Sequence, residues 1–113
     1  MTQNAPRLSS EMLVSALVRR VQAEGGFATV LQRGDSMAGA VLLECVDRGV
    51  RNVILERSSR PDGKDGWHLV SITDAQKQVD WLTRRRDFDP DLWVVELDTP
   101  QAERFAAEIL GST

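Results

Sequence analysis

The sequence of 113 residues contains one cysteine, one histidine and no tyrosine, and these scarcities exclude several kinds of site. A single cysteine, Cys45, rules out an internal disulfide and any zinc site built from several cysteines of one chain. A single histidine, His68, does not by itself suggest a nucleophile, a base and an orienting group together. We therefore predict no catalytic constellation, no metal site and no cofactor.

The chain also lacks an excess of positive charge and any long apolar run. Its net charge is −3 and its pI about 5.1, so no global basic field attracts nucleic acid. The N-terminal MTQNAPRLSS has no apolar core of signal-peptide length, and no window approaches a membrane span. We expect no membrane association, and a soluble protein of the reducing cytoplasm, where a lone cysteine stays free.

What remains is the composition of an ordinary globular domain, 42% hydrophobic and 27% charged. We predict a flexible lead over residues 1–8 and one domain over 9–113, with a radius of gyration of about 13 Å. Helices are expected to begin at Ser9 or Ser10, at Thr73 and at Thr99, each with a capping residue. Strands are expected over residues 27–33, 38–46, 50–57, 67–72 and 91–98, with a long polar loop over 58–66.

The resulting order, α-β-β-β-β-α-β-α, predicts an α+β domain with a mainly antiparallel five-stranded sheet. Short connections predict that the first four strands form a meander, and the second helix a crossover to the fifth strand. We expect the helices to pack on one face of this sheet. The other face would then stay partly apolar, which favours an interface such as that of a homodimer.

The segment RRRDFDPDLWVVEL, residues 84–97, has aspartates at the first, third and fifth positions of a calcium loop. The sixth position, which needs glycine, is Leu92. The residue before Pro90 avoids the α region, so the helix must end there. We interpret this stretch as a helix end, a break and a buried strand, with Trp93 in the core.

A second interpretation groups polar residues of two loops into a ligand site. Arg33, Asp35, Asp89 and Asp91 together would bind an anionic substrate and supply a base, as in a small hydrolase or transferase. This site requires the turn at Gly34 to meet the loop at Asp89. A third class, nucleic-acid binding through the arginine triplet of residues 84–86, is disfavoured by the neighbouring aspartates.

Three segments together resemble a known family: LVSALVRR (13–20), QRGDSMAGAVLL (32–43) and RDFDPDLWVVELD (86–98). In this order and spacing the chain is similar to domain-of-unknown-function family 1491, small alphaproteobacterial proteins. The resemblance implies a single domain and supplies no catalytic residues, because the family has no assigned activity. The C-terminal residues 99–110 depart from the family pattern, since here they are predicted to form a helix.

From these observations we predict a non-enzymatic binding or interaction domain. Its partner is a second copy of the chain, forming a homodimer, or another protein. Trp81 lies off the apolar stripe of the second helix, so we expect it at the interface.

Overall fold

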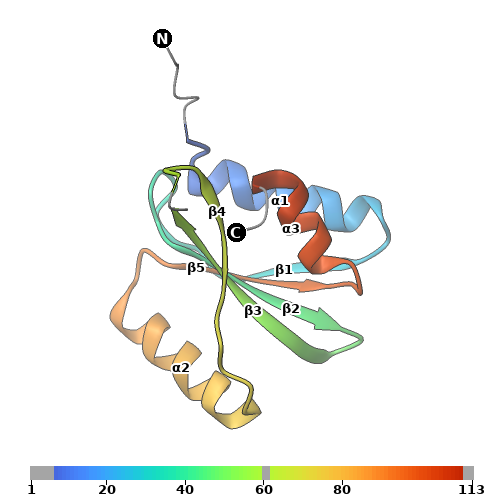
Figure 1. The fold of residues 1–113 in the computed structure, drawn as a ribbon, viewed down its shortest axis with the longest axis vertical. Helices are drawn as coiled ribbons and strands as arrows, with labels where there is room; N and C mark the ends of the chain where they lie inside the picture. Colours follow the sequence, from blue (N-terminus) through green and yellow to red (C-terminus); the bar gives the residue numbers. More distant parts are fainter. Residues whose placement is uncertain (1–6, 60–61, 111–113) are drawn as a thin grey trace.

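The computed structural model describes residues 7–59 and 62–110, and its elements follow the predicted order (Figure 1). Residues 1–6 of the predicted lead lie outside the described residues. The radius of gyration is 13.7 Å, close to the expected value. The elements are α1 (Ser10–Ala23), β1 (Phe27–Gln32), β2 (Val41–Asp47), β3 (Val50–Ser59), β4 (Asp65–Leu69), α2 (Ala75–Phe88), β5 (Trp93–Asp98) and α3 (Ala102–Leu110).

Helix α1 begins and ends where its capping residues require. The Ser9 side chain accepts a hydrogen bond from the Met12 amide at 3.2 Å, which satisfies one of the unpaired N–H groups of the first turn. Three residues at helical spacing, Leu13, Leu17 and Val21, are fully buried against the sheet. Gly25 then takes a left-handed backbone conformation, with φ of +82°, and turns the chain into β1.

The sheet has the strand order β1-β5-β2-β3-β4, and this corrects the predicted four-strand meander. Strands β2, β3 and β4 are antiparallel neighbours as expected, but β5 lies between β1 and β2. It runs antiparallel to β1 and parallel to β2, so the sheet is mixed. The physical reason is burial: Trp93, Val94 and Val95 are buried on alternating faces, and such a strand needs a neighbour on each side.

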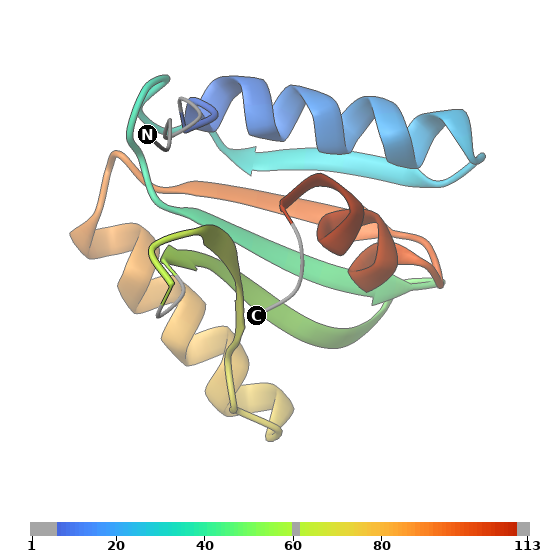
Figure 2. The same ribbon diagram turned by 45° about the horizontal axis from the view of Figure 1, so that its top comes forward.

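The prediction that all helices pack on one face is wrong. Helices α1 and α3 cover one face, and α2 covers part of the other (Figures 1 and 2). Neighbouring residues of β2 therefore enter different cores: Leu43 packs under α1 and α3, whereas Leu42 packs with Leu82 of α2. Because the central strands are apolar on both faces, each face requires a helix.

Helix α2 differs from the prediction in its cap and in its buried stripe. Its N-cap is Asp74, not Thr73, and the Asp74 carboxylate accepts from the Lys77 amide at 2.9 Å. Within the helix only Gln78 and Leu82 are buried, and the apolar Val79 is 43% exposed. A mostly polar helix covers only a small area of the sheet.

The remaining differences concern boundaries and the last turn of the chain. Strand β3 extends into the predicted 58–66 loop, and β4 begins inside it at Asp65. Helix α3 is described up to Leu110, and residues 111–113 lie outside the described residues. Among the described helices, none combines the length and apolarity needed to cross a bilayer.

Candidate functional site

The turn at Gly34 and the loop at Asp89 meet, as the predicted ligand site requires. The Asp35 amide donates to the Asp91 carbonyl at 2.9 Å, and the Gln32 side chain donates to the Asp89 carbonyl at 3.2 Å. A Cβ on Gly34 would lie 2.1 Å from the Asp91 carbonyl oxygen, so the two loops touch through their backbones. This contact places the end of β1 beside the start of β5.

The side chains at this junction are already engaged. The Asp35 carboxylate accepts from the amides of Met37 and Ala38, at 3.2 and 2.8 Å. The Asp89 carboxylate accepts from the Asp91 amide at 3.1 Å. These are the bonds by which aspartate stabilises turns. These turn roles explain the presence of Asp35 and Asp89, so neither residue requires a ligand to account for it.

Arg33 points away from these aspartates toward α1. Its guanidinium lies 2.6 Å from the Glu11 carboxylate and 5.1 Å from the centre of the Trp93 ring. The Trp93 indole N–H in turn donates to the Asp35 carbonyl at 2.7 Å. Among the described residues, no ion pair joins Arg33 to Asp35, Asp89 or Asp91. The two loops of the predicted site thus touch through their backbones, but the Arg33 side chain does not contact the three aspartates.

Arg33 instead forms the rim of a shallow groove between α1 and β1, about 360 Å³ in volume. The groove is apolar at its base and polar at its rim. The buried Val14 and Trp93 form its base, Val18 and Val30 add apolar lining nearer to solvent, and the polar Glu11, Ser15, Arg19 and Arg33 form its rim. We call this the α1–β1 groove.

Strand β1 forms one edge of the sheet, next to this groove, and it is unusually apolar for an edge. None of its six residues, FATVLQ, carries a charge. Phe27, Val30 and Leu31 are 74%, 41% and 38% exposed. Edge strands are commonly protected from pairing by charged residues, by proline or by bulges. Here a bulge between Val30 and Gln32 interrupts the strand, and Arg86 of α2 donates to the Leu31 carbonyl at 3.4 Å.

This apolar edge was not predicted from the sequence, although the first strand of a meander also lies at an edge of its sheet. The available signal was the composition of residues 27–32, which carry no charge. Figure 2 shows β1 and α1 together at one boundary of the molecule. The edge and the α1–β1 groove therefore form one surface.

The lone cysteine and histidine lie on opposite faces of the sheet. Cys45 belongs to the core under α1 and α3. His68 lies opposite Glu56 in the sheet, and Glu56 lies opposite Leu42, which belongs to the core under α2. Residues opposite each other share a face, so His68 is on the α2 face. Burial raises the pKa of the Cys45 thiol to about 12, so it stays protonated at neutral pH. These two residues do not form a nucleophile and base pair.

Trp81, predicted at an interface, is half-buried against the core under α2. The Arg85 guanidinium lies 5.1 Å from its ring centre and also pairs with Glu56 at 2.9 Å. Arg86 donates to the Gln32 side chain at 3.2 Å. Helix α2 is thus fixed to the sheet by two residues of the arginine triplet, and the role of Trp81 in an interface stays a prediction.

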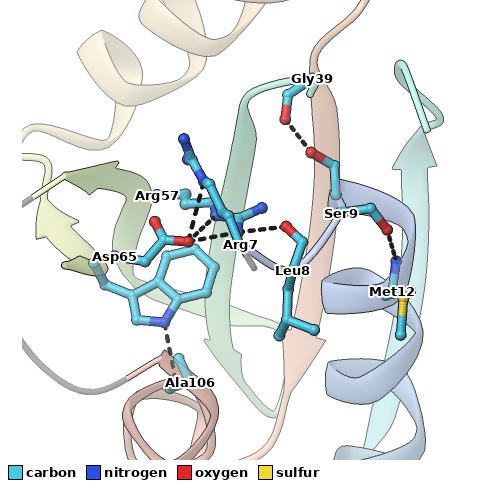
Figure 3. A network of polar contacts seen from close by, with 10 residues as sticks. Arg7, Leu8, Ser9, Met12, Gly39, Arg57, Asp65 and Ala106 are labelled. Atoms are coloured by element: carbon cyan, nitrogen blue, oxygen red, sulfur yellow. Dashed lines mark hydrogen bonds and ion pairs between the residues drawn. The ribbon is translucent and has the colours of Figure 1, made fainter. Parts of the chain in front are cut away.

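A buried ion pair holds the N-terminal segment at the far end of the sheet (Figure 3). Arg57 of β3, whose side chain is 3% exposed, donates to Asp65 of β4 and to the Leu8 carbonyl. Arg7 also donates to Asp65, at 3.2 Å. The second carboxylate oxygen of Asp65 is buried and has no hydrogen-bond partner among the described residues. These contacts join residues 7 and 8 to β3 and β4, so the cluster attaches the N-terminal segment to the domain.

A second groove, about 570 Å³ in volume, lies where β3 continues beyond the end of β4. It is lined mainly by apolar side chains of β3 and of the segment leading to α2, among them Val50, Val53, Leu69 and Ile72. Val50 and Leu69 are 70% and 49% exposed. Within residues 7–59 and 62–110, no three His, Cys, Asp or Glu side chains gather as metal ligands would.

Comparison with known proteins identifies relatives of this fold. The family model described as protein of unknown function, DUF1491, matches residues 8–107. An NMR structure of a DUF1491 family protein from Caulobacter crescentus is 36% identical, with a TM-score of 0.75 over 90% of this chain and 94% of that one. A crystal structure of a DUF1491 family protein from the same organism is also 36% identical, with a TM-score of 0.75 over 88% and 94% of the two chains.

A solution structure of a protein from A. tumefaciens is 32% identical and has a TM-score of 0.70, covering 96% of both chains. None of the curated proteins matches the sequence. The resemblance predicted from the three sequence segments is confirmed over nearly the whole described chain, including much of the C-terminal helix. This protein therefore belongs to the DUF1491 family, a family of unknown function.

Proposed function

We propose that the protein is a non-enzymatic interaction domain that binds an extended polypeptide along the free edge of β1. The observation that carries this proposal is the edge itself, six uncharged residues with three exposed large apolar side chains. An extended segment added to a sheet edge gains backbone hydrogen bonds along its length, and side-chain pockets then give specificity.

The α1–β1 groove supports this mode of binding because it lies beside the strand that would pair. Val30 belongs to both the strand and the groove. Alternate side chains of a bound strand would point toward the apolar base of this groove. The exposed rim arginines, Arg19 and Arg33, add positive charge, partly offset by Glu11. The rim thus favours a segment with an acidic residue near the groove.

The two alternative functions have weaker support. A hydrolase or transferase with an Arg/Asp site is favoured by the contact between the two loops. It is disfavoured because Asp35 and Asp89 already accept backbone hydrogen bonds. Nucleic-acid binding has little support, since Arg85 and Arg86 contact side chains of the sheet.

The proposed cellular compartment is the cytoplasm. A free, buried Cys45 fits this reducing compartment.

Site-specific photocrosslinking in the native host tests the proposal. A benzophenone amino acid replaces Phe27 in one variant and Val79, an exposed residue of α2, in a matched control. We expect protein adducts at position 27 that disappear when Thr29→Lys is added, because lysine protects a strand edge. Equal adduct yields at positions 27 and 79, or adducts insensitive to Thr29→Lys, would refute binding at this edge.

A further inference from the structure

We infer that the polypeptide bound at β1 is β1 of a second copy, so that two antiparallel β1 strands join two sheets into one. This inference rests on the proposed function and adds the identity of the partner. It starts from an internal symmetry of the strand. In Phe27-Ala28-Thr29-Val30-Leu31, apolar residues stand at equal distances on both sides of Thr29.

Antiparallel pairing centred on Thr29 brings matching residues together. Ala28 of one copy lies opposite Val30 of the other, and Phe27 lies opposite Leu31, the residue at the bulge of β1. Residues opposite each other in a sheet share a face, so each apolar pair is brought together on one side. Phe27 and Leu31, 74% and 38% exposed in the single chain, would cover each other. Two threonines meet at the centre, where their hydroxyls favour pairing.

The charges that flank β1 are complementary in the same register. Arg33 of one copy lies opposite the Glu24–Gly25 turn of the other. The Arg33 and Glu24 side chains are 67% and 45% exposed. Their present partners, Glu11 and Arg20, form exposed ion pairs of the kind that contribute little stability. Both ends of the paired strands thus gain an opposite charge, and no charged residue lies between them.

The position of α1 also permits this pairing. A two-fold axis perpendicular to the sheet places the two α1 helices on the same face, one on each side of the axis. The flank of α1 that faces the groove carries Val14, Ser15 and Val18, with Glu11 before them and Arg19 after them. Its middle is uncharged, so two such flanks can pack at the 8–10 Å or so usual for helices. The groove would then be filled by the partner strand and the flank of the partner helix.

A hetero-partner is the competing occupant of the same edge. An unrelated strand would use the same backbone groups, but the symmetry about Thr29 and the opposite charges at the two ends would have no purpose. Self-pairing uses both. The second apolar groove, at Val50 and Leu69, has no comparable complement among the described residues.

Two measurements on the full chain test the self-pairing. Sedimentation equilibrium over a range of concentrations should give twice the chain mass of 12.6 kDa. Thr29→Lys places two positive charges opposite each other at the axis and should raise the dimer dissociation constant at least about tenfold. Val79→Lys, on exposed α2, should leave it unchanged. Circular dichroism confirms that both variants are folded.

Disulfide formation gives a second readout that does not depend on dimer strength. Thr29→Cys places two thiols opposite each other at the axis and should form a covalent dimer under mild oxidation, whereas Val79→Cys should stay monomeric. The native Cys45 is buried and does not interfere. A monomer at every concentration, together with no Thr29→Cys dimer, would overturn self-pairing. So would a dimer unaffected by Thr29→Lys. Photocrosslinked adducts at position 27 to a different protein would overturn self-pairing and leave the interaction domain standing.

Discussion

Replacing Gly39 by alanine tests whether the junction between the two loops holds the candidate surface in place. An alanine Cβ at this position would lie 2.1 Å from the Asp91 carbonyl oxygen, and 3.0 Å from both the amide nitrogen and the carbonyl oxygen of Asp35. All three are backbone atoms, so no flexible side chain can move aside. The loop of residues 33–40 must shift away from the start of β5.

The cost of this shift has two parts. Overpacking a well-packed site costs about 1–3 kcal/mol. The loop also caps α1, because the amides of Ser10 and Glu11 donate to the carbonyls of Met37 and Ser36 at 3.1 and 2.9 Å. Weakening these bonds adds about 0.5–1.5 kcal/mol each. We therefore expect Gly39→Ala to lower the free energy of unfolding by about 2–6 kcal/mol, a large part of the stability of a domain this size.

Urea unfolding followed by tryptophan fluorescence measures this change directly. Trp93 reports on the junction because its indole N–H donates to the Asp35 carbonyl. Ser36→Ala, an exposed position in the same loop, is the matched control and should change stability by less than about 0.5 kcal/mol. If Gly39→Ala were as stable as Ser36→Ala, the two loops would not be in contact and the groove would lack its fixed rim.

Three further predictions concern the core and the buried ion pair. Since the folded state raises the pKa of Cys45 from 9.0 to about 12, the stability advantage of wild type over Cys45→Ala is constant below pH 9. It should fall by about 1.4 kcal/mol per pH unit from pH 9 to 12, and a constant difference in urea unfolding would contradict this. Trp67→Phe removes the bond to the Ala106 carbonyl, 2.9 Å long, and should cost about 1–3 kcal/mol in thermal unfolding. Arg57→Met leaves the Asp65 carboxylate without its buried partner and should lower the free energy of unfolding by about 3 kcal/mol. The double variant Arg57→Met/Asp65→Leu should regain much of this loss. If it does not, packing and not charge holds β3 and β4 together here.

The elements of the fold were predictable from local signals, and their order in the sheet was not. Ser9 and Gly25 fix the ends of α1 through bonds within a few residues, so sequence alone locates them. The cap of α2 was placed one residue early because Thr73 and Asp74 are both good capping residues. The place of β5 between β1 and β2 depends on pairing between segments that are distant in the sequence. The short connections between β1, β2, β3 and β4 instead suggest that each strand pairs with the next one.

The candidate site was predictable in its location and not in its surface. The predicted site requires contact between the Gly34 turn and the Asp89 loop, and this contact is present. The roles of the aspartates were ambiguous because aspartate is typical both of turns and of ligand sites. Hydrogen bonds to backbone amides favour the turn role for Asp35 and Asp89. Arg33 lines the α1–β1 groove, where it lies beside α1 and not among the aspartates.

Pairing at β1 would also explain why an exposed apolar edge need not lead to open-ended aggregation. In the joined sheet β4, together with the part of β3 that continues beyond it, would form the outer edge on both sides. Strand β4 has five residues, and its first, Asp65, is held by a buried ion pair to the neighbouring strand. Beyond Leu69 the chain leaves the edge toward α2. Short edges with charged residues resist pairing. An isologous contact at β1 uses the same surface on both copies and closes at two chains. The asymmetry between the two edges of the sheet therefore favours a defined dimer over a growing fibre.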